Sequence, residues 1–205
     1  MKLRRFFALI PVLVLTACNG QAADADFKKD QMDVPEGAET LTLGAGCFWC
    51  VEAVYQQIPG VYSAVSGYMG GHVAEPTYAQ VCTGTTGHAE VVQVVYDPKK
   101  LPTEKLLEWF WDLHDPTQVD GQGADIGPQY RSMIFYHTDA QKKIAEASKK
   151  EAQKKKDKPI VTKIEKAKTF YKAEKNHQDF YFLNKSNGYN RAVIAPKLDK
   201  LHLQK

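Results

Sequence analysis

Residues 41–52, with the sequence LTLGAGCFWCVE, join a short apolar run to a pair of cysteines. The apolar run predicts a buried strand and the residues after it predict a helix. Cys47 is therefore expected in the turn between the end of the strand and the start of the helix. The first turn of a helix presents free N–H groups and the positive end of its dipole, which favour a thiolate over a thiol. Cys50 follows one helical turn later, so the two sulfurs are expected to meet. The stretch therefore predicts a redox nucleophile with a resolving partner.

The chain from residue 39 to residue 205 is long enough for one domain with a sizeable core, and its apolar patterns alternate irregularly between strand and helix spacing. Strands are expected over 39–45, 61–69, 89–96, 130–136, 159–164 and 168–171, and helices over 48–58, 103–113, 138–156 and 176–183. The stretch 115–129 is punctuated by glycine and proline and is long for a connecting loop, which is typical of a functional segment. We expect an α+β fold, a two-layer sandwich with a mixed sheet in the form of a ferredoxin-like plait with additions, rather than a doubly wound parallel sheet.

The first residues have the pattern of an export leader. Basic residues precede an apolar stretch over residues 6–17, and twelve residues of helix span about 18 Å, too short for a bilayer core. The stretch is typical of a signal peptide, and its end, LTAC over 15–18, resembles the cleavage site of bacterial lipoproteins, in which the cysteine is acylated. We expect a lipoprotein-type signal peptide over 1–17 and a lipid on Cys18 that anchors an extracytoplasmic protein to a bacterial membrane. The alternative is ordinary secretory cleavage beside a chance cysteine.

The charge of the chain changes when this leader is removed. Residues 1–17 contain three basic residues and no acidic one, so the formal net charge falls from +3 to 0. The basic character therefore belongs to the leader and does not indicate a nucleic-acid partner. Residues 18–38 are small and polar with few apolar anchors, which predicts a flexible tether behind the lipidated N-terminus. The lysines between 142 and 175 interleave with alanine and glutamate, which favours a solvated helix face.

Three cysteines, Cys47, Cys50 and Cys82, lie in the part of the chain expected to fold. An odd number outside the cytosol argues against a disulfide framework and suits a working pair with one spare thiol. We interpret Cys82 as a small buried core residue. The histidines lack the spacing of a zinc site, so we expect no metal and no other cofactor.

Four segments, 46–52, 76–78, 87–90 and 123–132, carry polar groups that have no evident structural purpose. Together they closely resemble the A-type peptide methionine sulfoxide reductases. The resemblance covers essentially all of residues 39–190, and Gly-Cys-Phe-Trp at the end of a first strand is highly specific when the other segments follow in this order. The further motifs that carry it are Ser66-Gly67-Tyr68, Gly84–Glu90, Tyr96-Asp97-Pro98, Trp111-Asp112-Leu113-His114-Asp115-Pro116 and Ala173-Glu174-Lys175-Asn176-His177-Gln178.

The chemistry of such an enzyme explains these residue types. A sulfoxide oxygen is a poor leaving group until it is protonated, so a reductase needs a thiolate aimed at sulfur, an acid at oxygen and an apolar seat for the S-methyl group. The resemblance implies reduction of methionine-S-sulfoxide, free or in oxidised proteins, with Cys47 as the nucleophile and Glu90 as the proton donor. The remaining site residues that it implies are Tyr78, Tyr130 and Asp125 on the oxygen side and Phe48 and Trp49 around the methyl group.

Recycling is where the chain departs from many relatives. Attack of Cys47 on the sulfoxide converts Cys47 to a sulfenic acid. A nearby thiol then condenses with this sulfenic acid to form a disulfide. Many relatives have glycine at the position of Cys50 and resolving cysteines near the C-terminus, whereas this chain has no cysteine after Cys82. We therefore expect a Cys47–Cys50 disulfide that a thioredoxin-like donor reduces, in a monomer that acts in protein repair.

Other functions fit parts of the pattern. Cys47 and Cys50 form a C-x-x-C pair, which also suits a general extracytoplasmic thiol–disulfide oxidoreductase, although Glu90 would then have no role. A non-enzymatic alternative is a surface lipoprotein that binds a partner through its lysine-rich face. At the level of single residues, the alternatives are that Phe48 and Trp49 are ordinary core residues and that Glu90 ends a strand at the surface.

Overall fold

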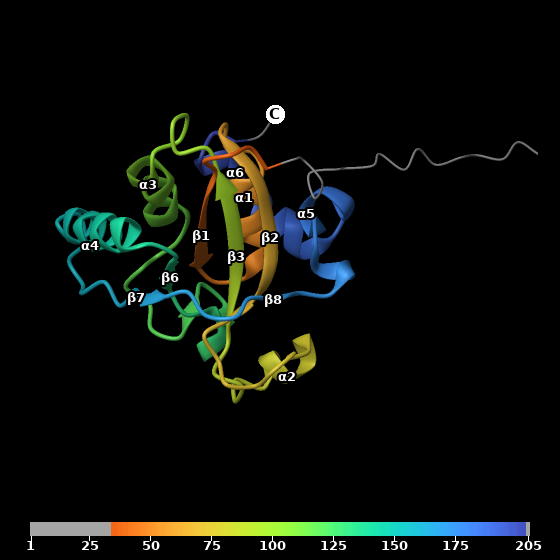
Figure 1. Cartoon of the computed structure of the whole chain (residues 1–205). Coiled ribbons are helices and arrows are strands. Elements are labelled where there is room, and N and C mark those ends of the chain that lie inside the picture. The colour runs from red at the N-terminus through yellow and green to blue at the C-terminus, as the bar shows by residue number, and fades with distance from the viewer. Residues whose placement is uncertain (1–33, 204–205) are drawn as a thin grey trace, which may run out of the picture.

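A six-stranded mixed sheet forms the centre of the computed structural model, which describes residues 34–203 (Figure 1). The predicted leader, Cys18 and most of the predicted tether lie outside the described residues. The strand order is β7-β6-β1-β3-β2-β8, in which only β6 and β7 pair in parallel. The strands are β1 (Glu39–Gly44), β2 (Val61–Met69), β3 (Ala89–Tyr96), β6 (Met133–Tyr136), β7 (Lys163–Lys166) and β8 (Tyr171–Lys172).

The four inner strands and two helices follow the ferredoxin-like plan. Along the chain they run β1, α1 (Phe48–Tyr55), β2, β3, α3 (Thr103–Leu113) and β6, and in the sheet the four strands lie in the order β6-β1-β3-β2. This is the β-α-β-β-α-β arrangement. The predicted α+β plait with a mixed sheet is confirmed, and the edge strands β7 and β8 are among its additions.

Both faces of the sheet are covered. Alternate residues of β3 point to opposite faces, so that Val92 and Val94 join the core cluster formed with the helices, whereas Val91 joins a second cluster with Met133. The second cluster packs against Phe170, in the segment between β7 and β8, which runs across the front of the sheet in Figure 1. Burial of each such aliphatic side chain contributes about 1.5–3 kcal/mol.

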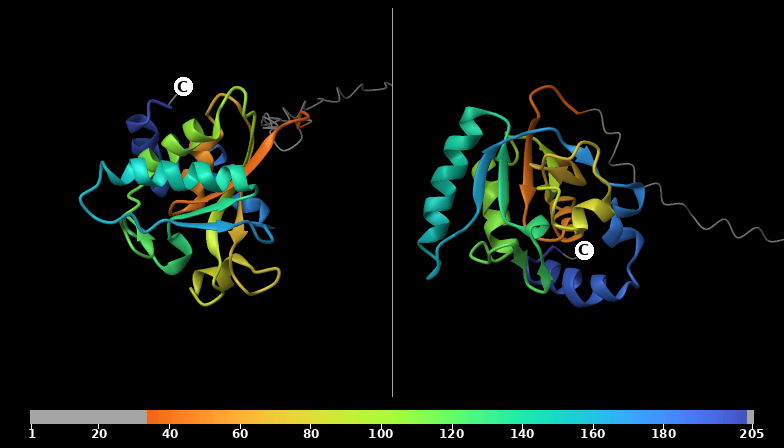
Figure 2. Two further views of the ribbon diagram at one scale, coloured as in Figure 1. Left: turned by 60° about the vertical axis from the view of Figure 1, so that its left-hand side comes forward. Right: turned by 90° about the horizontal axis from the view of Figure 1, so that it is seen from below.

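The remaining elements are short, apart from one long helix. That helix, α4 (Asp139–Gln153), begins with a capping box in which the Thr138 side chain accepts from the backbone N–H of Gln141. It lies beside the edge of the sheet formed by β6 and β7 (Figure 2). The others are α2 (Tyr78–Cys82), β4 (Gly121–Gln122), β5 (Asp125–Ile126), η1 (Pro128–Tyr130), η2 (Lys175–His177), α5 (Phe180–Leu183), η3 (Asn190–Ile194) and α6 (Ala195–Lys200).

The C-terminal segment differs from its prediction. A single helix was expected over 176–183, but α5 begins only at Phe180, because Asp179 has a left-handed backbone with φ of 53°. Helical structure that the sequence did not predict then continues in η3 and α6, where Ile194 and Leu198 are fully buried. These elements pack on α1, and they therefore bring the C-terminal part of the chain to the cysteine pair.

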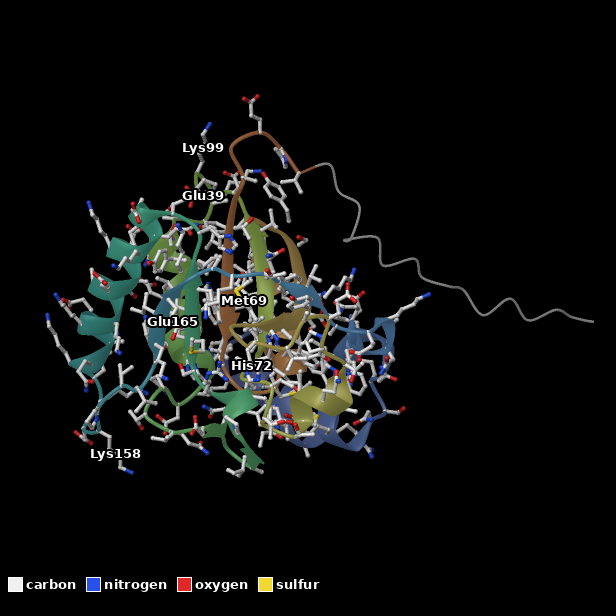
Figure 3. The ribbon with its side chains drawn as sticks, turned by 60° about the horizontal axis from the view of Figure 1, so that its bottom comes forward. Glu39, Met69, His72, Lys99, Lys158 and Glu165 are labelled. Atoms are coloured by element: carbon white, nitrogen blue, oxygen red, sulfur yellow. The ribbon has the colours of Figure 1, made fainter. Side chains whose placement is uncertain are left out.

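The strand ends that carry the site meet at one end of the sheet. Figure 3 shows Glu39 at the start of β1 and Lys99 after β3 at one end, and His72, which follows β2, at the opposite end. At the His72 end, β1 finishes at Gly44, where a Cβ atom would lie 3.1 Å from the Glu90 carbonyl oxygen. None of the helices within residues 34–203 has the length and apolar content needed to cross a membrane.

Candidate active site

Cys47 occupies the turn between β1 and α1, as its position in the sequence predicted. It is the N-cap of α1, with φ of −56° and ψ of 125°, and only 8% of it is exposed. The turn depends on Gly46, whose φ is +89° and whose missing Cβ atom would lie 2.6 Å from the Gln122 side chain. Cys50 lies within the first turn of α1 and is 2% exposed. The two cysteines are free and buried together at the helix start.

The two thiols share a hydrogen bond and differ in acidity. Burial raises the pKa of Cys47 well above its ordinary value, and neighbouring Cys50 and Glu90 add to the rise. The hydrogen bond from Cys47 lowers the pKa of Cys50 to about 7, although burial opposes this, and the charge of Lys197 assists. Burial and the contact with Cys50 thus oppose the helix start, which alone would favour the thiolate expected at Cys47.

The Glu90 carboxyl group lies at the same helix start. Its Oε2 atom accepts a hydrogen bond of 3.0 Å from the backbone N–H of Phe48, and the residue is 1% exposed. Burial raises the pKa of Glu90 to about 8, and the charges of Asp125 and Cys50 also raise it, against the effect of the Phe48 N–H group. The alternative of a surface strand end is excluded. Glu90 is a carboxylic acid that keeps its proton at neutral pH.

A tyrosine that the sequence analysis missed links Asp125 to the cysteine pair. The Tyr189 hydroxyl donates a hydrogen bond of 2.7 Å to Asp125 Oδ2 and lies 3.8 Å from Cys50 Sγ. It also forms a hydrogen bond with the Cys47 side chain. Tyr189 follows the polar residues Ser186-Asn187-Gly188, and nothing in that local pattern indicates chemistry. Only the packing of the C-terminal segment on α1 brings it to the site.

Tyr78 and Tyr130 approach the site from two other elements, α2 and η1. Both are half-buried, and burial raises the pKa of each hydroxyl, with the charge of Glu90 as a further cause in both. Both therefore remain protonated hydrogen-bond donors at neutral pH. The Tyr78 hydroxyl is hydrogen-bonded to the side chain of Cys82, which is exposed, so the interpretation of Cys82 as a buried core residue is wrong. Its place on the short helix α2 puts the thiol at the surface.

Aromatic rings surround the cysteine pair on the side of the C-terminal segment. Trp49 stacks on Phe180 with ring centroids 3.7 Å apart and an angle of 8° between planes. Phe48 is 1% exposed and packs against His177 with ring centroids 5.4 Å apart. It is therefore a core residue, which agrees with the alternative interpretation of Phe48 given above. Trp49 is only partly buried and meets Tyr189 edge-on at 5.8 Å. The rings give the site an apolar wall.

Arg131 joins the two loops that carry the site residues, and the sequence analysis missed it as well. Its guanidinium group donates to the carbonyl oxygens of Gly87 at 2.8 Å, His88 at 3.2 Å and Pro128 at 2.7 Å. The first two precede Glu90, and the third lies in η1 with Tyr130. A planar group with several donors suits this role. Arg131 thus fixes the acid and one tyrosine relative to each other.

Two buried histidines, His88 and His114, make internal hydrogen bonds. His88 Nδ1 accepts from the Gly71 N–H group, which leaves Nε2 to donate to the Val73 carbonyl oxygen at 2.7 Å. His114 lies between Phe110 O and Ser132 Oγ, and burial lowers its pKa to about 3. Within residues 34–203, no group of three or more His, Cys, Asp or Glu side chains is arranged to hold a metal ion.

The chain is similar in sequence and in structure to known proteins. Residues 39–205 match the family model of peptide methionine sulfoxide reductase. The peptide methionine sulfoxide reductase MsrA of Saccharolobus solfataricus is 51% identical over 162 residues, which cover 79% of this chain and 92% of that protein. The crystal structure of Mxr1 from Saccharomyces cerevisiae in reduced form has a TM-score of 0.72 and 37% identity, covering 75% of this chain and 89% of Mxr1. A structure of Mxr1 from Saccharomyces cerevisiae in complex with Trx2 has a TM-score of 0.53 and 31% identity. The match covers 70% of this chain and 86% of the matched chain.

Proposed function

The chain belongs to the peptide methionine sulfoxide reductase family and reduces methionine sulfoxide, and from this premise we propose the residues that carry out the reaction. The observation that carries the proposal is the position of Glu90. A buried carboxylic acid, bonded to the backbone of Phe48, lies next to the thiol of Cys47 at a helix start. A nucleophile and an acid at one place are what reduction of a sulfoxide requires.

In the first half of the reaction, Cys47 Sγ attacks the sulfoxide sulfur. Glu90 gives its proton to the oxygen, and the proton that leaves the Cys47 thiol restores the Glu90 acid. The oxygen moves with its proton to Cys47, and the thioether of methionine leaves. A thiol and a sulfoxide have then become a sulfenic acid and a thioether with no net change in protons. The high pKa of Cys47 fits this sequence, because the resting thiol supplies the proton.

The other predicted residues bind the two ends of the sulfoxide group. Tyr78 and Tyr130 keep their hydroxyl protons and donate hydrogen bonds to the oxygen as it gains charge, and Asp125 orients this network. Phe48 and Trp49 hold the S-methyl group against the aromatic wall. Relatives of the A type act on the S epimer, and we propose the same preference here.

In the second half, Cys50 resolves the sulfenic acid. Its thiol shares a hydrogen bond with Cys47, and its lowered pKa favours the attacking thiolate. The bond from Cys50 to Cys47 forms as water leaves, and two electrons from a dithiol then reduce the Cys47–Cys50 disulfide. The Mxr1–Trx2 complex supports a thioredoxin-like donor for this step. The enzyme repairs oxidised methionine in proteins or as the free amino acid.

We also propose a place for the enzyme in the cell. Residues 1–17 act as a lipoprotein signal peptide, residues 18–38 form the tether, and acylated Cys18 holds a monomeric catalytic domain over 39–205 at an extracytoplasmic membrane surface. Expression of the full chain in a bacterial host tests this. The wild type should be found in the membrane fraction, and Cys18→Ala should not. A wild type that is released in soluble form would show ordinary secretory cleavage instead.

Reduction of a synthetic peptide carrying each sulfoxide epimer of methionine, with dithiothreitol as reductant, tests the activity. The wild type should form methionine from the S epimer, and Cys47→Ser should form none while keeping its unfolding temperature. Cys82→Ser is the matched control, and it should retain the activity. Reduction of insulin disulfides without any methionine product would identify a general thiol–disulfide oxidoreductase instead. Binding of a partner that survives Cys47→Ser, again without methionine product, would identify the non-enzymatic alternative.

A further inference from the structure

Tyr189 touches a reacting atom of the second half of the reaction. Its hydroxyl oxygen lies 3.8 Å from Cys50 Sγ, and the hydroxyl group donates a hydrogen bond of 2.7 Å to Asp125 Oδ2. A tyrosine hydroxyl has one proton to donate, so its oxygen is free to accept from a thiol. The arrangement is therefore directed, from the Cys50 S–H group to Tyr189 and from Tyr189 to the Asp125 carboxylate.

We propose that Tyr189 and Asp125 form a proton relay that deprotonates Cys50 when it resolves the sulfenic acid, an inference that rests on the proposed function. The Cys50 thiol proton moves to Tyr189 Oη as the Tyr189 proton moves to Asp125. The electron pair left on Cys50 forms the bond to Cys47 Sγ, and the S–O bond of the sulfenic acid breaks. The leaving hydroxide takes the proton from Asp125 and becomes water. A sulfenic acid and a thiol thus become a disulfide and water, and both relay residues return to their starting states.

The surroundings of the relay suit this role. Cys50 is 2% exposed, so bulk water does not readily take its proton. The charge of Lys197 favours the Cys50 thiolate that the relay produces. Tyr189 itself is held in place by its edge-on contact with Trp49 and by buried Asn190, whose side-chain amide donates to Asn184 O at 2.7 Å. Tyr189 is therefore a catalytic residue for disulfide formation.

The test separates the two halves of the reaction in one experiment. The reduced enzyme is mixed with a methionine-S-sulfoxide peptide without reductant, and quenched samples are assayed for methionine, for dimedone-trapped sulfenic acid and for the disulfide. Tyr189→Phe should slow disulfide formation relative to methionine formation by about tenfold or more at pH 6, so that sulfenic acid accumulates. The deficit should disappear at pH 9, where the Cys50 thiol ionises without help. Asp125→Asn should also lower the ratio of the rate of disulfide formation to the rate of methionine formation. The double variant with Tyr189→Phe and Asp125→Asn should lower this ratio no further.

Tyr136→Phe is the matched control, because it removes a hydroxyl from a half-buried ring on β6 that lies below Lys142 Nζ. It should leave the ratio of the two rates unchanged. Disulfide formation in Tyr189→Phe at the wild-type rate at pH 6, an equal loss in both halves, or a deficit that persists at pH 9 would each overturn the relay. Failure of the wild type to form methionine would instead overturn the proposed function on which the relay rests.

Discussion

The Glu90 carboxyl group accepts a hydrogen bond of 3.0 Å from the backbone N–H of Phe48, the residue that follows Cys47. Phe48 and Glu90 are 42 positions apart in the sequence, and pairing of β1 with β3 brings them together. The bond ties the acid to the helix that begins at the nucleophile. The fold therefore sets the distance between the proton donor and the attacking thiol through main-chain geometry.

Replacement of Glu90 by glutamine tests the acid. Glu90→Gln keeps an oxygen that can accept from the Phe48 N–H group but has no acidic proton, so methionine formation should slow by about 10²–10⁴-fold. The unfolding temperature should stay close to that of the wild type, which separates lost chemistry from lost structure. Single-turnover methionine formation measures the effect. A variant within a factor of two of the wild type would show that Glu90 is not the proton donor.

The pH dependence follows from the raised pKa of Glu90. The acid must be protonated, and its pKa is about 8, so single-turnover methionine formation should be constant at neutral pH and fall as the pH rises through about 8. The rates should be measured from pH 6 to pH 10 in the wild type and in Glu90→Gln. The alkaline fall should be absent from the variant. The same fall in both proteins would assign it to another group.

Loss of the resolving thiol should leave methionine formation intact and stop disulfide formation. Cys50→Ser should still form one methionine per enzyme, because Cys47 and Glu90 are intact, and then stop as a sulfenic acid. Turnover with a thioredoxin-like dithiol protein should fall at least tenfold, whereas dithiothreitol, which reduces the sulfenic acid directly, should sustain turnover. Cys82→Ser should behave as the wild type with both reductants. Undiminished turnover of Cys50→Ser with the protein donor would show that another thiol resolves.

The Arg131 clamp should matter for both stability and activity. Arg131→Lys keeps the charge but replaces the two spaced guanidinium nitrogens that reach the carbonyl groups of Gly87, His88 and Pro128 with a single nitrogen. It should lower the free energy of unfolding by about 1–3 kcal/mol. It should also lower kcat more than it raises KM, because Glu90 and Tyr130 lose their common support. The exposed Arg191, changed to lysine, is the control and should have neither effect. Unchanged unfolding and kinetics in Arg131→Lys would show that the clamp is dispensable.

A second buried acid, Glu52, should make stability depend on pH. Burial and the charge of Asp179 raise its pKa from 4.5 to about 8, so the folded chain holds a proton that the unfolded chain releases between these values. The free energy of unfolding should therefore fall as the pH rises from about 5 to about 9, and Glu52→Gln should remove this residue's share of the fall. Urea unfolding at pH 6 and pH 9 measures it. An equal pH dependence in wild type and variant would contradict the assignment.

The central strands and the position of the nucleophile could be predicted because their signals are local. The run before Gly46 and the alternation in β3 each reflect burial of neighbouring residues, and the motifs around Cys47 and Glu90 are specific. The ionisation of the cysteine pair could not be predicted in the same way. It depends on burial and on Glu90, which the helix-start argument for Cys47 left out.

Tyr189 and Arg131, the two residues that were missed, reach partners far away in the sequence. Tyr189 is 139 positions from Cys50, and its polar surroundings in the sequence carry no periodic pattern. Arg131 binds carbonyl oxygens, which every residue has, so no motif marks its partners. Cys82 was expected to be buried from its residue type alone, whereas the short helix α2 exposes it.

Mass-spectrometric mapping of the cysteines after one turnover tests the chemistry most directly. The reduced full chain is incubated with a methionine-S-sulfoxide peptide, the free thiols are blocked, and the linked peptides are identified. We predict one methionine per enzyme together with a Cys47–Cys50 disulfide and a free Cys82. A Cys47–Cys82 link, or methionine formed while Cys47 remains a free thiol, would contradict the mechanism.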